Sequence, residues 1–360
     1  MTIRVLGITG DPDRPTAATF IGLRSAGIDL RAVRTPSEAA NEALHAAGVP
    51  LLDIPVDRRA AATGARRLRA ELQQGRYDIL HLFGNRALEN GLRASRGLPV
   101  RIVAYRGIVG NVSFLSPVSW RRYLNPRIDR IVCVADAVRD HFLNMRPSWL
   151  RMPAERLVTI HKGHSLDWYA DPPADLRALG VPPDAFTVVC VANYRPRKGI
   201  ELLVEAMPAL PDEVHLLLVG HMDSRALHRR IAANPASSRI HRPGYLTEAP
   251  AVAGACDVAV LPSIKREGLP RSVIEAMAYK TPPIVTDSGG NPELVVDGIS
   301  GLVVPARDSA AIARAIRRLH DDAELRNRMG AAARERIRTH FRIEDTIAKT
   351  EALYRDLAST

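Results

Sequence analysis

The 360-residue sequence predicts an α/β protein built from two doubly wound parallel sheets. Short apolar runs rich in β-branched residues alternate with longer helical segments, which is the usual pattern of such sheets. The length suits about two domains, each with its own core. A polar, proline-rich run at 167–183 interrupts the alternation, and we interpret it as the connection between the domains.

The first half of the sequence alternates in this way from its beginning. Strands are expected at 3–8, 29–33, 51–55, 77–83, 100–105, 128–134 and 156–160, and helices at 16–26, 37–47 and 60–74. Gly10 follows the first strand and would permit a close approach to a ligand. His81 lies near the end of the strand at 77–83, where a place in a ligand cleft is weighed against a hydrogen-bonded structural role.

The second half continues the same alternation. Strands are expected at 186–192, 214–220, 240–245, 258–262 and 283–285, and helices from 200 onward and at 271–279, 309–319, 322–339 and 343–357. Asp321 and Asp322 stand at a helix start, where adjacent acids cap the helix and complement its dipole. We therefore predict no metal site from this pair, and the sequence has no paired Cys/His spacing for zinc.

The net charge of +11 is concentrated in the first half. Residues 1–170 contain 25 Lys and Arg against 15 Asp and Glu, whereas residues 171–360 contain 25 against 24. A basic domain can face anionic lipid, an anionic acceptor or nucleic acid, or it can carry a solvated arginine-rich surface. Because the sequence has no helix-turn-helix, zinc-finger or RNA-recognition signature, we predict no nucleic-acid partner.

The three cysteines, Cys133, Cys190 and Cys256, lie in or beside apolar runs. An odd number of buried thiols favours a reducing cytosol over a disulfide framework. No apolar run is long enough to cross a bilayer, and the N-terminal residues read as a first strand rather than a secretion signal. We therefore expect a cytoplasmic protein.

Two segments of the basic half mix aromatic residues with arginines, namely 113–127 and 141–152. Side chains of these types suit the interface of a membrane, because their apolar bodies and polar ends fit the headgroup region. Ordinary packing of amphipathic helices is the alternative for each segment. Together the two segments support peripheral contact with an anionic membrane as a hypothesis.

The most informative stretch runs from residue 257 to 305. It reads as strand, loop, helix, strand and glycine loop, with Glu267 in the first loop, Glu275 on the helix, and Gly289 and Gly290 in the last loop. Loops of this kind stand at the carboxyl ends of parallel strands, where open α/β sheets bind ligands. Two carboxylates that accept hydrogen bonds from hydroxyl groups, beside a helix start that attracts phosphate, would fit a ligand with sugars and phosphates.

This stretch resembles a known family signature. Glu267-Gly-Leu-Pro-Arg-Ser-Val-Ile-Glu275, followed by Gly289-Gly290-Asn-Pro-Glu and Gly298-Ile-Ser-Gly301-Leu-Val-Val-Pro, resembles the glutamate-x7-glutamate motif of the retaining GT-B glycosyltransferases of family 4. The resemblance implies a GT-B fold, in which two Rossmann-like domains face each other across a cleft. It implies an acceptor domain at 1–166, a donor domain at 167–340 and a terminal helix at 341–360 that returns to the first domain.

The resemblance also implies site roles. Glu267 would contact hydroxyls of the transferred sugar, Glu275 would hold the ribose, and Lys198 with Arg195 or Arg197 would grip the diphosphate. Tyr245 and Leu246 would lie against the nucleotide base. The loop residues expected beside the nucleotide sugar are Gly268, Leu269, Pro270, Gly289 and Gly290.

The sequence departs from the family pattern at four places. Gly10-Asp-Pro-Asp13 replaces a glycine pair, Arg106 stands near a usual histidine, and Asn193 replaces an arginine that grips the pyrophosphate. The turn at 161–167 fits the usual asparagine-glycine-valine-aspartate only loosely. Arginine binds phosphate or carboxylate but is no base, so Arg106 is a candidate contact to an anionic acceptor or donor, against a surface salt bridge.

The implied enzyme is a retaining hexosyltransferase that uses a UDP- or GDP-sugar, with no cofactor and no required metal. Its acceptor would be a glycan or glycolipid, such as a lipopolysaccharide core or another cell-envelope glycan, assembled at the inner face of the cytoplasmic membrane. A GT-B epimerase or phosphorylase and an inactive nucleotide-sugar-binding module remain as alternatives. A nicotinamide-dependent oxidoreductase is disfavoured, because no G-x-G-x-x-G turn follows the first strand of either domain.

Overall fold

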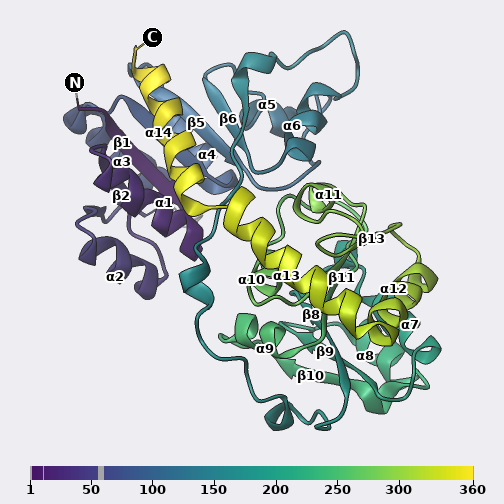
Figure 1. The fold of residues 1–360 in the computed structure, drawn as a ribbon. Coiled ribbons are helices and arrows are strands. Elements are labelled where there is room, and N and C mark those ends of the chain that lie inside the picture. Colours follow the sequence, from purple (N-terminus) through teal and green to yellow (C-terminus); the bar gives the residue numbers. More distant parts are fainter. Residues whose placement is uncertain (1, 11, 56–60, 360) are drawn as a thin grey trace. The chain divides into compact units, whose positions relative to one another are not determined.

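Two parallel sheets organise the chain, as predicted. The computed structural model describes residues 2–10, 12–55 and 61–359, and in this part of the chain the sheets have seven and six strands. Each sheet lies in its own compact unit (Figure 1). Unit 1 comprises Met1–Gly163 and Phe341–Thr360, and unit 2 comprises His164–His340.

The sheet of unit 1 has the strand order β3-β2-β1-β4-β5-β6-β7, with every pairing parallel. Its strands are β1 (Arg4–Thr9), β2 (Asp29–Val33), β3 (Leu51–Leu52), β4 (Ile79–Phe83), β5 (Arg101–Arg106), β6 (Arg130–Cys133) and β7 (Leu157–Thr159). The order reverses between β1 and β4, and doubly wound sheets bind ligands outside the carboxyl ends of the strands at such a point.

Unit 1 has seven α-helices in the described residues, and the sequence predicts the first three and the last of them. They are α1 (Arg14–Ser25), α2 (Glu38–Ala46), α3 (Ala61–Gly75), α4 (Asn85–Ala94), α5 (Pro117–Arg121), α6 (Asp136–Leu143) and α14 (Ile343–Ser359). The predicted start of α3 at Ala60 lies outside the described residues. No helix was expected at 85–94, although the buried residues Ala87, Leu88, Gly91 and Leu92 of α4 recur at helical spacing.

The C-terminal helix α14 belongs to unit 1 and packs along α1 (yellow and purple in Figure 1). Gly22 of α1 makes this approach close, because a Cβ there would lie 2.2 Å from Ile347 Cδ1. Tyr354 is fully buried, and its hydroxyl lies 2.6 Å from Nδ1 of His81. His81 is 3% exposed, so it lies buried in unit 1.

The sheet of unit 2 has the order β10-β9-β8-β11-β12-β13, again parallel, with its reversal between β8 and β11. Its strands are β8 (Phe186–Val191), β9 (Val214–Val219), β10 (Ile240–Gly244), β11 (Val258–Leu261), β12 (Pro283–Thr286) and β13 (Leu302–Val304). Its helices are α7 (Ile200–Ala206), α8 (Arg225–Ala232), α9 (Ala249–Ala255), α10 (Arg271–Ala278), α11 (Asn291–Leu294), α12 (Ser309–Asp321) and α13 (Ala323–His340).

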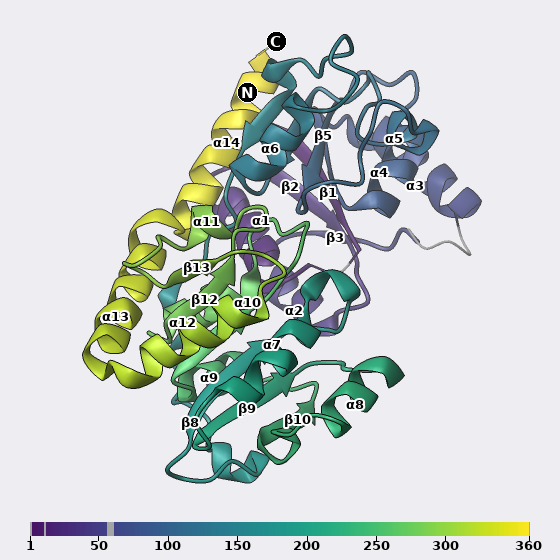
Figure 2. The same ribbon diagram turned by 90° about the vertical axis from the view of Figure 1, so that its right-hand side faces the viewer.

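Alternate residues of the unit 2 strands point to opposite faces and build two separate cores. On β8, Val188 and Cys190 pack in one core with α7, α8 and α12, whereas Val189 packs in the other with α9 and Ala276 of α10. Helices therefore cover both faces of this sheet (Figure 2). Asp322 accepts a hydrogen bond from Leu325 N, as expected of a cap at the start of α13.

None of the helices in the described residues is both long enough and apolar enough to span a bilayer.

We predict that His81 makes the stability of unit 1 depend on pH. Burial lowers the pKa of His81 to about 3, so between pH 6.5 and 3 the unfolded chain binds a proton that the folded chain does not. The free energy of unfolding should fall as the pH falls through this window, by up to about 1.4 kcal/mol per pH unit. Urea denaturation at pH 6.5, 5.5 and 4.5 measures it. His81→Asn, which keeps a polar partner for Tyr354 but does not titrate, should flatten the dependence, and an unchanged slope would contradict the assignment.

Candidate functional site

Glu267 is the centre of the candidate site in unit 2. It lies in the loop between β11 and α10, at the carboxyl edge of the sheet, and only 5% of it is exposed. Its Oε1 accepts hydrogen bonds from Lys198 Nζ at 2.8 Å and from Ser263 Oγ at 2.6 Å. Arg197 Nη1 lies 3.9 Å from the same oxygen. A buried carboxylate needs such partners, because an unpaired charge in the interior is strongly disfavoured.

The glycine loop after β12 fits tightly against the backbone of Glu267. Gly289 has φ +61°, and a Cβ there would lie 2.1 Å from Glu267 O. The same carbonyl accepts a hydrogen bond from Gly290 N at 3.2 Å. Gly289 is therefore required for a close approach between two backbone segments, which places the glycine loop beside Glu267.

Glu275 lies on α10, eight positions after Glu267, and 13% of its side chain is exposed. Its Oε1 is 3.2 Å from Arg271 Nε, one turn earlier on the same helix. Between the two glutamates, Gly268 and Pro270 are buried and Leu269 is half-buried. The loop thus leads from a deeply buried carboxylate to a partly accessible one.

The cationic loop after β8 reaches Glu267 through Lys198 and Arg197. Gly199 ends this loop at φ +64°, where a Cβ would lie 2.2 Å from Pro262 O, so the loop lies close to the strand end of β11. Arg195 is exposed, and within the described part of the chain its guanidinium donates only to the neighbouring carbonyl of Tyr194, at 3.2 Å. Of the two arginines proposed to replace the missing one, Arg197 is the one beside the carboxylate.

Asn193 is uncharged and forms a hydrogen bond with the loop after β9. Its Oδ1 accepts a hydrogen bond from His221 N at 3.0 Å. The ring of His221 stacks on Tyr245, with centroids 5.2 Å apart and planes 12° from parallel. Tyr245 is 60% exposed, and Leu246 packs partly buried against the core that contains Val189. Both predicted base contacts therefore follow β10 at the carboxyl edge of the sheet.

Unit 1 has a cavity of about 420 Å³ at the carboxyl ends of β1, β4 and β5, where its strand order reverses. Gly10, Asp13, Tyr105, Arg106 and Lys162 are among its lining residues. The predicted loop residue Asp11 lies outside the described residues. The cavity combines aromatic ring faces with charged groups, a combination suited to a polar ring bearing hydroxyls.

Asp13 and Lys162 form an ion pair in this cavity. Lys162 Nζ lies 3.1 and 3.0 Å from the two carboxylate oxygens of Asp13, and 5.0 Å from the centre of the Tyr105 ring. Asp13 also caps α1, because its Oδ1 accepts hydrogen bonds from Thr16 N and Thr16 Oγ1. Burial alone would raise the pKa of Asp13, but the charge of Lys162 and these hydrogen bonds outweigh it and hold the pKa below its ordinary value.

Arg106 is turned into unit 1 and is 5% exposed. Its guanidinium donates to the carbonyls of Ile108, at 3.0 Å, and Gly110, and it lies over the ring of Tyr123. These contacts shape the loop that lines the cavity, and among the residues that the structure describes Arg106 has no salt bridge.

Asp13, Lys162 and Ser263 were not singled out from the sequence. Lys162 stands in the turn that departs from the family pattern, and Asp13 follows the missing glycine pair, so both departures were signals of a changed site. Their pairing over 149 positions could not be read from sequence spacing. Ser263 comes directly after an apolar strand and carried no signal of its own.

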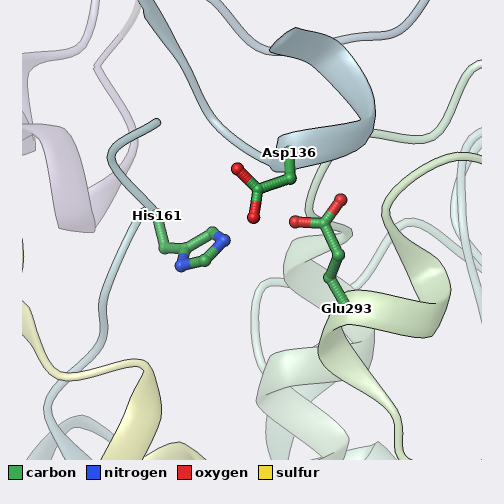
Figure 3. Close-up of side chains that lie close together, drawn as sticks. All are labelled: Asp136, His161 and Glu293. Atoms are coloured by element: carbon green, nitrogen blue, oxygen red, sulfur yellow. The ribbon is translucent and has the colours of Figure 1, made fainter. Parts of the chain in front are cut away.

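Asp136 and His161 are a second polar pair of unit 1 (Figure 3). Asp136 begins α6 and accepts a hydrogen bond from Thr159 Oγ1 at 2.6 Å, while His161 follows β7. Glu293, drawn in the same figure, comes from α11 of unit 2. Two ligands are fewer than a protein zinc site needs, so the pair alone does not make a metal centre.

Comparison with known families covers most of the chain. Residues 173–336 match the family model of glycosyl transferases group 1, and residues 20–168 match that of glycosyltransferase family 4. The chain is 30% identical over 284 residues to a phosphatidyl-myo-inositol mannosyltransferase of Mycobacterium leprae, in an alignment that covers 76% of this chain and 72% of that protein. It is 33% identical over 186 residues to the lipopolysaccharide core biosynthesis glycosyltransferase LpsE of Rhizobium meliloti, covering 51% of this chain but only 53% of LpsE.

Solved structures share the fold over nearly the whole chain. The Anabaena protein Alr3699/HepE, solved in complex with UDP, superposes with a TM-score of 0.80 at 21% identity and covers 99% of this chain and 100% of its own. Sucrose-phosphate synthase of Thermosynechococcus elongatus gives a TM-score of 0.77 at 23% identity, with 99% of each chain covered.

We predict that Lys162→Met destabilises unit 1, because it leaves the carboxylate of Asp13 without its cation. The expected loss is about 1 to 3 kcal/mol, less than for a fully buried pair, since 21% of the Lys162 and 24% of the Asp13 side chain is exposed. Urea denaturation measures it. Adding Asp13→Asn, which can still cap α1, should restore part of the loss, whereas strictly additive effects would contradict the pairing.

Proposed function

This chain belongs to glycosyltransferase family 4, and we propose that it transfers a sugar from a nucleoside-diphosphate sugar to an acceptor hydroxyl with retention of anomeric configuration. The observation that carries the proposal is the buried Glu267 carboxylate, paired with Lys198 beside the glycine loop at the carboxyl edge of unit 2. A carboxylate can accept hydrogen bonds from sugar hydroxyls, and a cation attracts diphosphate. These two groups are hydrogen-bonded to each other at this edge of the sheet.

The donor side of the reaction follows from these charges. The diphosphate gathers negative charge as the bond to the sugar breaks, and Lys198 and Arg197 are placed to stabilise it. We propose that these cations stabilise the leaving diphosphate and that no metal ion is required. Glu267 orients the sugar, and Glu275 holds the ribose from the adjoining helix.

We propose the cavity of unit 1 as the acceptor site. Its two cations are already engaged, Lys162 by Asp13 and Arg106 by backbone carbonyls. The Asp13 carboxylate accepts hydrogen bonds, so it suits a hydroxyl-bearing acceptor such as a glycan or the head of a glycolipid. The relatives named for phosphatidyl-myo-inositol and for lipopolysaccharide core support an envelope glycan or glycolipid as the acceptor. We propose that this product is made at the inner face of the cytoplasmic membrane.

Exposed apolar side chains support peripheral membrane contact by unit 1. In the first aromatic segment Leu115 is 80% and Trp120 is 44% exposed, and in the second Trp149 is 82% exposed. Phe114 and Phe142 of the same segments are buried, so each segment divides into a packed part and an exposed part. Exposed tryptophan with arginine nearby in sequence fits an anionic membrane surface.

The donor site is tested by thermal-shift measurements with UDP, GDP, ADP and their glucose and mannose conjugates. One nucleotide series should raise the melting temperature, because a ligand at 100 times its Kd stabilises by about 2.7 kcal/mol. Glu275→Ala should abolish this rise. Glu324→Ala is the matched control, since Glu324 is also a helical glutamate of unit 2 paired one turn away, with Arg328.

The same measurements separate the alternatives. Loss of the rise in Glu324→Ala, or its persistence in Glu275→Ala, would argue against the proposed site. Conversion of the donor without an acceptor to an isomeric sugar nucleotide would favour an epimerase. Donor binding without turnover on any envelope acceptor would favour an inactive binding module.

Membrane contact predicts that the protein sediments with vesicles containing phosphatidylglycerol at low salt and not with pure phosphatidylcholine. Trp149→Ala should weaken binding by about tenfold, because a large apolar side chain no longer enters the interface. Ile299→Ala is the control, since Ile299 is 62% exposed but lies in unit 2. Equal effects of the two substitutions, or no binding to anionic vesicles, would contradict the proposal.

A further inference from the structure

Three buried polar side chains form a chain of hydrogen bonds that ends on Glu267. Ser263, Thr286 and Asn291 are each 0% exposed. Asn291 Nδ2 donates to Thr286 O at 3.0 Å, Thr286 Oγ1 donates to Ser263 O at 2.5 Å, and Ser263 Oγ lies 2.6 Å from Glu267 Oε1. The chain therefore joins the start of α11, the end of β12 and the loop after β11.

The direction of the last hydrogen bond is fixed by chemistry. An ionised carboxylate only accepts, so the hydroxyl of Ser263 must donate its single proton to Glu267. The hydrogen bond from Thr286 fixes the backbone of Ser263, and the position of that backbone sets where the Ser263 hydroxyl points. Hydrogen bonds to a charged partner are the stronger kind, so this one can hold an orientation.

The contacts of the Glu267 carboxylate are unequal. Ser263, Lys198 and Arg197 all approach Oε1. Oε2 accepts no hydrogen bond from the residues that the structure describes. Because the terminal torsion of a glutamate is broad, the two cations alone would leave the carboxylate free to rotate toward them. The directional bond from Ser263 opposes that rotation.

We propose that Ser263, supported by Thr286, is a positioning residue that binds Oε1 of Glu267 and leaves Oε2 to accept a hydroxyl of the donor sugar. The inference rests on the proposed function, in which Glu267 contacts that sugar. It assigns Ser263 to recognition of the sugar and not to binding of the nucleoside diphosphate.

Ser263→Ala tests the proposal by separating two affinities. Isothermal titration is performed with UDP and UDP-glucose, and with GDP and GDP-mannose. In the variant the affinity for the nucleoside diphosphate should stay within twofold of that of the wild type. The factor by which the attached sugar raises the affinity should fall by about tenfold or more, because Glu267 is then misplaced relative to the sugar. Turnover of the accepted donor should fall in kcat more than it rises in KM for the donor.

Three further variants show whether the effect comes from loss of the Ser263 hydroxyl or from a general disturbance of the structure of unit 2. Ser263→Thr keeps the hydroxyl and should retain the sugar-dependent gain. Thr286→Val removes the supporting hydrogen bond and should lose part of it. Thr281→Val is the matched control, because Thr281 is 3% exposed and its hydroxyl donates to Ala253 O at 2.8 Å, away from Glu267. Thermal unfolding of each variant shows whether unit 2 is intact.

The outcomes distinguish this inference from the proposed function. A wild-type sugar-dependent gain in Ser263→Ala, or an equal loss in Thr281→Val and Thr286→Val, would overturn the positioning role and leave the donor site standing. If the wild-type protein binds none of the four ligands, nor ADP or an ADP-sugar, the donor proposal fails, and the role of Ser263 fails with it. If Ser263→Ala does not fold, Thr286→Val and Ser263→Thr give the same test.

Discussion

The buried carboxylate of Glu267 is the constraint on which unit 2 depends. A charge that is 95% removed from water is tolerated only with partners, and Lys198, Arg197 and Ser263 converge on one of its oxygens. That convergence requires three loops to lie close together, which explains why Gly199 and Gly289 stand where a Cβ would meet a backbone carbonyl. The same loops therefore determine both how the backbone packs and which side chains surround Glu267.

Both units use the same geometry with different side chains. Parallel strands end at one edge, and each sheet places its charged groups there, near the reversal of its strand order. In unit 2 the cation Lys198 meets a carboxylate from the loop after the neighbouring strand β11, whereas in unit 1 Lys162 meets Asp13 across the length of the unit's sequence. The first pair carries the donor proposal, and the second defines the cavity proposed for the acceptor.

Most strands and helices could be predicted from the sequence, because their apolar periodicity is a local property. The bounds of β2 are those expected, and the stretch 257–305 folds as strand, loop, helix, strand and glycine loop. Local patterns could not reveal the inward turn of Arg106 toward backbone carbonyls. They also could not pair Tyr354 with His81, because the residues are 273 positions apart and only the folded chain brings them together.

The return of the chain to unit 1 at Phe341 has a consequence for synthesis. While the ribosome translates unit 2, the sheet of unit 1 is complete, but α14 has not emerged to cover α1 and to supply Tyr354. Residues 164–340 can therefore mature first, although they begin later, and the earlier-made part waits with an uncovered apolar face. Transiently exposed apolar surface of this kind is what chaperones bind on nascent chains.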